Sequence, residues 1–105
     1  MEEREFLTLA DAELARLEAA LDKLVDSDAV DLDVERKPGG IIEITLDNDS
    51  KIIVNRHAAA REIWVAARSG GFHFRPHEGR WVGTRDGEEL GSALARCLSA
   101  QAGAT

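Results

Sequence analysis

Hydrophobic residues follow two different periods along this chain. From Glu3 to Asp26 they recur at steps of three and four, with no Gly or Pro between them. This spacing predicts one long amphipathic helix, because residues three and four apart share a helix face. The expected buried stripe is Phe6, Ala10, Leu14, Leu17, Leu21 and Leu24.

After this helix the period changes to two, which is typical of strands with one buried and one exposed face. Short runs rich in Gly, Pro, Asn or Asp separate the alternating segments and predict tight turns. Residues 56–60, with three alanines, fit either a helical turn or a crossover. The predicted strands are 30–35, 41–46, 51–55, 62–66, 72–75 and 80–82.

The C-terminal region returns to a helical period. Asp86 is the expected N-cap, and Glu89 three residues later completes a capping box that opens a helix extending to about Gln101. The inner face of this helix is expected to carry Leu90, Ala93, Leu94, Cys97 and Leu98.

The order of these elements predicts an α+β fold in a single domain, residues 1–105. Short turns favour antiparallel neighbours, and two terminal helices can cover only one face of the resulting sheet of five or six strands. We therefore expect a two-layer sandwich whose second sheet face is open to solvent.

Charge is distributed very unevenly along the chain. Residues 1–35 contain twelve Asp or Glu against three Lys or Arg, a local net charge of −9. Residues 36–105 contain eight acids against ten bases, or +2, which together with −9 gives the total of −7. Nucleic acid is a poor partner for such a surface, because phosphate binding needs positive charge.

Composition limits the remaining classes. Apolar residues make up 44% and charged residues 31%, as in a globular domain. No apolar run approaches the roughly 20 residues of a membrane span, and the acidic N-terminus lacks a signal-peptide pattern, so we expect no membrane association and a cytoplasmic location. The one cysteine, Cys97, cannot form an internal disulfide and is expected to be an inert core thiol.

The acids of the first predicted helix gather on one side of it. At about 100° per residue, they form one ridge beside the buried stripe, whereas Arg16 and Lys23 lie on the opposite flank and do not neutralise it. In the following strand the acids alternate onto one face. If helix and strand are neighbours, one continuous anionic surface results from Asp11, Glu18, Asp22, Asp26, Asp28, Asp31, Asp33 and Glu35.

Carboxylate oxygens suit hard cations, so this surface could collect Fe²⁺, Fe³⁺, Ca²⁺, Mg²⁺ or Mn²⁺. The sequence has no calcium-loop motif, no Glu-x-x-His helix motif and no His near these acids, so binding is expected to be weak, multiple and unselective. The alternative is equally open: acids on an edge strand block aggregation, and acids on a helix form a solvated face.

Other candidate residues lie on the predicted sheet. If Ile63 and Val65 point into the core, Trp64 points to the open face as a partner anchor, or else packs against Arg and Lys stems. Asn55 ends a strand, where it is either a contact residue or a turn residue. His73 and His77 are not expected to share a metal, and we find no motif of an enzyme active site, so no catalytic residue is predicted.

Several motifs together resemble the bacterial frataxins, the CyaY type, over nearly the whole chain. They include the acidic helix and first strand described above, and both tryptophans. The segments that carry the resemblance are 5–11 (EFLTLAD), 51–56 (KIIVNR), 63–66 (IWVA), 70–74 (GGFHF) and Trp81.

The resemblance implies the frataxin fold and a role in iron–sulfur cluster assembly, with weak binding of Fe²⁺ or Fe³⁺ at several sites on the acidic surface. It further implies that this surface docks on a basic surface of the cysteine desulfurase and that an iron–sulfur scaffold protein is a second partner. Partner contacts would fall on Glu18, Asp22, Asp31, Asp33, Asn55 and Trp64.

The resemblance leaves alternatives for the function: an iron donor or regulator without enzymatic activity, an iron-oxidising storage protein, or an acidic interaction module with incidental metal binding. A monomer is expected, with oligomers possible in the presence of iron. The chain departs from its relatives at Ala59 and Glu62, where Pro and Gln are common, and at Ala19 and Lys23, where further acids are common, so the helical part of the ridge is thinner.

Overall fold

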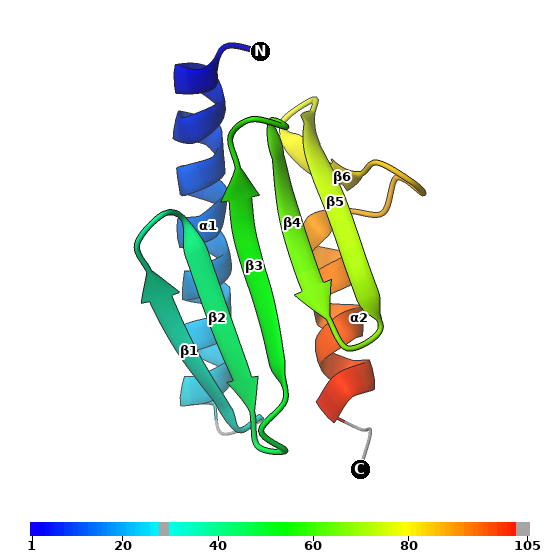
Figure 1. Ribbon diagram of the computed structural model, residues 1–105. Coiled ribbons are helices and arrows are strands. Elements are labelled where there is room, and N and C mark those ends of the chain that lie inside the picture. Colours follow the sequence, from blue (N-terminus) through cyan, green and yellow to red (C-terminus); the bar gives the residue numbers. More distant parts are fainter. Residues whose placement is uncertain (28–29, 103–105) are drawn as a thin grey trace.

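A computed structural model describes residues 1–27 and 30–102 of the chain. Two helices enclose six strands in the sequence, as predicted. Figure 1 labels these elements, which are α1 (Glu3–Asp26), β1 (Leu32–Lys37), β2 (Ile41–Leu46), β3 (Lys51–His57), β4 (Glu62–Ala67), β5 (Gly70–His77), β6 (Arg80–Gly83) and α2 (Leu90–Ala102).

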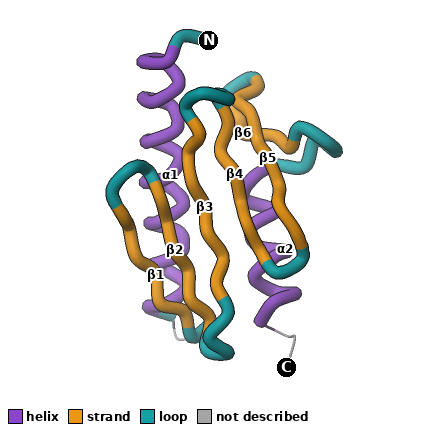
Figure 2. The backbone as a smooth tube through the Cα atoms, in the orientation of Figure 1, coloured by secondary structure: helices purple, strands orange, loops and turns teal. Residues whose placement is uncertain are grey.

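The strands form one antiparallel sheet in which spatial order equals sequence order, from β1 to β6. Each strand pairs with the next through a short turn, which fixes the register Ile42↔Val54↔Val65 across the sheet centre. Figure 1 shows both helices on the same side of the sheet, α1 behind β1 to β3 and α2 behind β4 and β5. The tube in Figure 2 shows the other face without any covering element, so the expected two-layer α+β sandwich is confirmed.

The core lies between the helices and the sheet. The predicted helix stripe from Phe6 to Leu21 is buried, and Ile42, Ile44 and Leu46 of β2 face it. Trp81 closes the far end of the core, where its ring meets Phe6 edge-on at a centroid distance of 5.9 Å. The residues predicted on the inner face of α2 are also buried or packed against this core, namely Leu90, Ala93, Leu94, Cys97 and Leu98.

Leu24, a predicted core residue, and Val30, the first residue of the predicted strand 30–35, are both exposed. Leu24 is 40% exposed and Val30 is 38% exposed. Both border an open groove of about 610 Å³ between the C-terminal ends of the helices, so neither is covered. β1 accordingly begins at Leu32, two residues later than the alternation predicts.

The ambiguous segment after β3 is a strand end followed by a tight turn. β3 continues to His57, and the Arg61 amide donates a hydrogen bond of 3.1 Å to the Ala58 carbonyl. Arg61 adopts φ +56°, and β3 pairs directly with β4, so this segment is a turn and not a crossover.

The predicted capping box is wrong. Asp86 does not cap α2, which begins four residues later at Leu90. Its carboxylate instead accepts a hydrogen bond of 3.0 Å from the Glu88 amide, an Asx turn that precedes the helix. Glu89 then bridges to Val82 of β6, which holds the chain extended up to the first helical residue.

No helix in residues 1–27 or 30–102 is long and apolar enough to cross a membrane.

Candidate functional site

The predicted acidic residues gather along one edge of the molecule, where β1 is the outer strand and α1 packs against it. Side chains alternate along β1, so Leu32 and Val34 pack on the core while Asp33 and Glu35 point to the open side. The carboxylates therefore form two rows. One row lies on α1, and the other lies along the edge strand β1 and the residue before it. We call the described members of these rows the acidic ridge: Asp11, Glu18, Asp22, Asp26, Asp31, Asp33 and Glu35. Asp28 lies outside the described residues.

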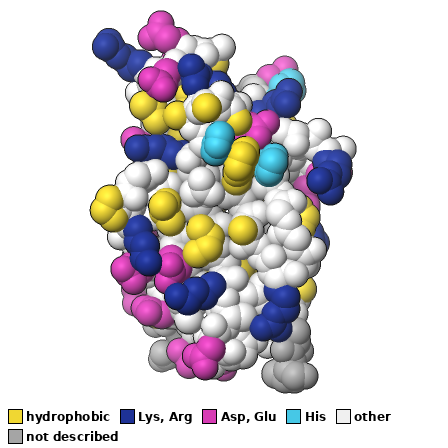
Figure 3. Space-filling view, in the orientation of Figure 1, with side chains coloured by type: hydrophobic (Ala, Val, Ile, Leu, Met, Phe, Trp, Pro, Cys, Tyr) yellow, Lys and Arg dark blue, Asp and Glu magenta, His cyan; other side chains and the backbone are white. Residues whose placement is uncertain are grey.

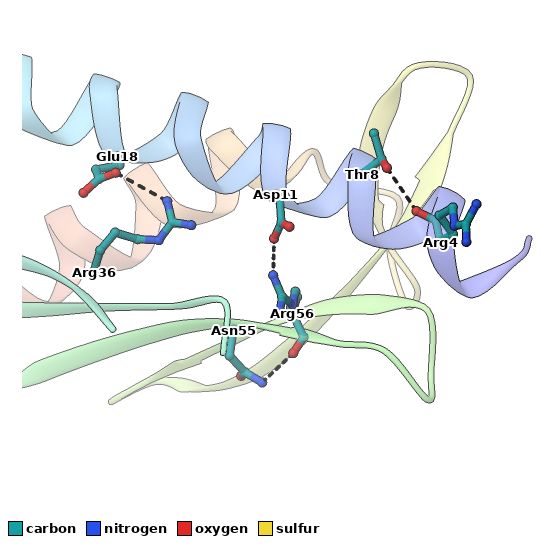
Figure 4. Close-up of polar contacts among 7 residues, drawn as sticks. All are labelled: Arg4, Thr8, Asp11, Glu18, Arg36, Asn55 and Arg56. Carbon is teal, nitrogen blue, oxygen red and sulfur yellow. Dashed lines mark hydrogen bonds and ion pairs between the residues drawn. The ribbon is translucent and has the colours of Figure 1, made fainter. Parts of the chain in front are cut away.

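Two helix acids of the ridge are paired with arginines from the sheet, contrary to the expectation that no base neutralises them. Arg36 of β1 reaches Glu18 with its Nη1 3.4 Å from Oε1. Arg56 of β3 forms an ion pair with Asp11 (Figure 4). The angular positions of side chains on the helix can predict only partners within the helix, and Arg36 and Arg56 belong to strands.

The Arg56 pair depends on Gly40 in the β1–β2 turn. A Cβ atom at Gly40 would lie 2.6 Å from Cδ of Arg56, and the backbone there has φ +76°. Glycine therefore both makes the turn and leaves the path along which the arginine crosses to Asp11.

The other ridge acids are less compensated. Asp22, Asp26, Asp31, Asp33 and Glu35 are all exposed. Within residues 1–27 and 30–102 none of these five forms a salt bridge.

Next to the ridge, on the open face, the negative charge of Glu43 is compensated by two lysines. Glu35 is directly opposite Glu43 of β2, a like-charge pair that is unfavourable across strands. Glu43 is held between Lys37 and Lys51, with N–O distances of 2.8 and 2.9 Å. The hydrogen bonds from Lys37 and Lys51 lower the pKa of Glu43, and the one to Glu43 raises the pKa of Lys37.

Trp64 points to the open face, as predicted, but its neighbours are histidines rather than Lys or Arg stems. It is stacked between His57 of β3 and His73 of β5, at centroid distances of 3.9 and 4.3 Å and interplanar angles of 12° and 10°. Figure 3 shows a hydrophobic side chain between two histidines on this face. This stack was not predicted from the sequence, because alternation places Trp64 on the open face but only the register across β3, β4 and β5 brings its neighbours beside it.

Glu62 anchors the stack. The indole Nε1 of Trp64 donates a hydrogen bond of 2.7 Å to Glu62 Oε1, and His73 Nδ1 lies 3.5 Å from the same oxygen. The second Glu62 oxygen is 3.8 Å from Arg75. Glu62 therefore supplies the acceptor for the indole N–H and also lies beside His73 and Arg75.

The remaining candidates are placed as follows. Asn55 is half-buried opposite Trp64, and its amide donates to the Arg56 carbonyl at 3.2 Å. His77 lies next to Glu78 in the β5–β6 turn rather than with His73. Cys97 is in the core. In the part of the chain that the structure describes, no three His, Cys, Asp or Glu residues form a group that could hold one metal ion.

Comparisons with known proteins agree with this architecture. Residues 1–104 match the frataxin-like domain family. A relative from Dechloromonas aromatica, named as an iron–sulfur cluster assembly protein CyaY, is 53% identical over 103 residues, covering 98% of this chain and 94% of that protein. Another of that name, from Ralstonia nicotianae, is 50% identical over 99 residues, covering 94% and 87%.

Solved structures show the same fold. A frataxin from Psychromonas ingrahamii superposes with a TM-score of 0.78 at 25% identity, covering 96% of this chain and 91% of that one. A trimeric frataxin from Saccharomyces cerevisiae, complexed with ferrous iron, gives 0.75 at 25% identity and covers 95% and 85%.

Proposed function

The chain belongs to the frataxin family, as a bacterial frataxin of the CyaY type, and on this premise we propose that it acts in iron–sulfur cluster assembly as an iron-binding regulator or iron donor. In this role it docks its acidic ridge on a basic surface of the cysteine desulfurase in the cytoplasm. The proposal includes no catalytic residue.

The observation that carries the proposal is the set of five exposed ridge acids without a salt bridge, from Asp22 to Glu35. Uncompensated like charge on one edge raises the electrostatic energy of the free protein. A basic protein surface or a cation relieves this repulsion. The same charge steers association, so it favours both ligands over a neutral partner.

Iron would bind weakly and at several places on this ridge. Carboxylate oxygens are hard ligands that accept Fe²⁺ and Fe³⁺ as well as other divalent cations. Side chains such as Asp22 and Asp26 are exposed on a helix surface, so each would offer a cation only one or two oxygens, with water completing the coordination. Asp11 and Glu18 would first have to leave Arg56 and Arg36.

The ridge and the open sheet face are proposed to contact different partners. The ridge meets the desulfurase through residues that include Glu18, Asp22, Asp31 and Asp33. Asn55 and Trp64, on the open face, meet the iron–sulfur scaffold protein. The open face has no helix over it, which supports its use as a second contact surface (Figure 2).

Charge reversal on the ridge tests the docking. The variant Asp22→Lys/Asp33→Lys replaces two attractive charges by repulsive ones, one in each row of the ridge. We expect the affinity for the desulfurase, measured by interferometry, to fall at least tenfold, because each reversal replaces an attraction to the basic partner by a repulsion. The effect of the protein on cluster reconstitution should be lost with this binding. The affinity of the parent should also decrease steeply as salt increases.

The matched control is Glu5→Lys/Glu78→Lys, which changes the net charge by the same amount. Both residues are exposed, and they lie at the start of α1 and in the β5–β6 turn. This control should bind much better than the ridge variant. Equal loss in both variants would mean that net charge, and not the ridge, determines binding; no loss in the ridge variant would refute the docking proposal.

A further inference from the structure

We infer that His57 and His73 are positioning residues that clamp Trp64 upright on the open sheet face, so that the scaffold partner meets the edge of the indole and not its flat face. This inference rests on the proposed function, since it concerns how the open face is recognised. It assigns a role to two histidines that the ridge does not use.

The geometry of the stack fixes the orientation of the indole. His57, Trp64 and His73 come from three adjacent strands, so the line that joins their rings runs across the sheet. Each imidazole plane is within 12° of parallel to the Trp64 ring, at a centroid distance close to van der Waals contact. Rings stacked along a line in the plane of the sheet stand perpendicular to the sheet, with one edge toward solvent.

Each outer ring of the stack has a polar contact, a hydrogen bond for His57 and a neighbouring carboxylate for His73. His57 Nδ1 accepts a hydrogen bond of 3.2 Å from the Ala60 amide, which ties its ring to the β3–β4 turn. His73 lies beside Glu62, the same carboxylate that accepts the hydrogen bond from the Trp64 indole. The charged groups near the stack are Glu62 and, beyond it, Arg75.

The clamp determines what a partner can contact. Both faces of the Trp64 ring are covered by imidazoles, and its only donor, Nε1, is already bonded to Glu62. The indole therefore offers an apolar C–H edge in a fixed rotamer. Fixing this side chain before binding saves the conformational entropy that an unclamped tryptophan would lose on docking.

His73 is the position at which to test the clamp, because its side chain is 47% exposed and it has no turn-capping hydrogen bond to lose. His73→Phe keeps an aromatic ring against the indole, whereas His73→Gln keeps a polar group without a ring. His77→Gln is the matched control, a histidine of the same strand that lies outside the stack.

The first measurement uses the isolated protein. The chain has two tryptophans, so an amide NMR spectrum contains two indole N–H signals. We expect His73→Gln to shift the Trp64 signal and to leave that of buried Trp81 unchanged, while His77→Gln moves neither. An unchanged Trp64 signal in His73→Gln would show that no clamp exists in solution.

The second measurement is the affinity for the scaffold protein. Loss of an aromatic pair should weaken binding by roughly two- to tenfold in His73→Gln, and His73→Phe should restore the parent value. Equal weakening of binding in both variants would mean that a His73 nitrogen contacts the partner. Parent-like binding by His73→Gln would mean that the clamp does not affect scaffold binding. Either result overturns the inference. Parent-like binding by Trp64→Ala would instead refute the proposed docking of the open face.

Discussion

Individual charge pairs decide how much negative charge the acidic ridge retains. Arg36 and Arg56 each reach one helix acid, and the rest of the ridge is exposed without a salt bridge in the described residues. Surface pairs of this kind contribute little to stability, about 0–1 kcal/mol at most. Their main effect is on the distribution of charge. They neutralise Asp11 and Glu18, so the uncompensated negative charge of the ridge lies at the C-terminal end of α1 and along β1.

The carboxylate of Glu43 allows a prediction at the scale of single residues. Its pKa is lowered by hydrogen bonds from Lys37 and Lys51, so the folded state favours the ionised form. That stabilisation is fully present above the pKa of the unfolded state and is lost as the pH falls through the folded-state pKa. We expect Glu43→Gln to melt below the parent at about pH 7, and this difference to shrink toward pH 3, in thermal denaturation followed by circular dichroism.

Glu35→Gln is the control for this experiment, because Glu35 faces Glu43 across the strands and makes no described ion pair. Its removal relieves repulsion and should leave the melting temperature unchanged or raise it. If both variants lower the melting temperature equally at neutral pH, the pairs with Lys37 and Lys51 are not the reason why Glu43 stabilises the protein.

At the scale of elements, periodicity predicted most of the fold. The bounds of α1 follow from an unbroken helical stripe, and the strands follow from alternation between turn residues. The start of α2 was not predicted correctly. In the sequence, an Asp that caps a helix cannot be distinguished from an Asp that forms an Asx turn before the helix, as Asp86 does. The ridge acids were predicted from one helix and one strand, but the pairs at Arg36 and Arg56 and the histidine stack depend on register across several strands.

The contact between α2 and two hairpins depends on one buried amide. Gln101 is 4% exposed; its Nε2 donates to Ser50 Oγ and to the Lys51 carbonyl at 2.8 and 3.1 Å, and its Oε1 accepts from the Arg68 amide at 3.0 Å. We expect Gln101→Ala to reduce the free energy of unfolding by about 1–3 kcal/mol, because it removes three part-buried hydrogen bonds and leaves the Arg68 amide and the Lys51 carbonyl without this partner. Urea denaturation measures this change.

Ser99→Ala is the matched control on the same helix, since Ser99 is exposed. It should change the free energy of unfolding by no more than about 0.5 kcal/mol. A Gln101→Ala variant as stable as this control would mean that water replaces the lost hydrogen bonds and that the amide is not needed to hold α2.

The whole molecule has a strongly asymmetric charge, with −9 on the first 35 residues and +2 on the remainder. α1 and the edge strand β1, which lie on one side of the sandwich (Figure 1), carry most of the described acids of this segment, whereas the stack lies on β3, β4 and β5. Two surfaces of different chemistry therefore lie on one small fold, an anionic edge and a sheet face with a central aromatic stack, whose carboxylates Glu43 and Glu62 are paired with basic side chains. If the proposed function holds, this separation would let the two proposed partners bind without competing for the same residues.

The charge asymmetry also predicts how stability responds to ions. Crowded carboxylates repel one another, and salt screens this repulsion over a Debye length of about 10 Å at 0.1 M and about 3 Å at 1 M. The melting temperature should therefore rise with NaCl, and rise further with MnCl₂ at equal ionic strength, because a divalent ion that binds the folded ridge adds its binding free energy. Asp22→Asn/Asp33→Asn, which removes one charge from each row, should melt above the parent at low salt and respond less to both salts. A flat response of the parent would show that the ridge is already compensated, and an equal response of both proteins would place the ion-sensitive charge elsewhere on the molecule.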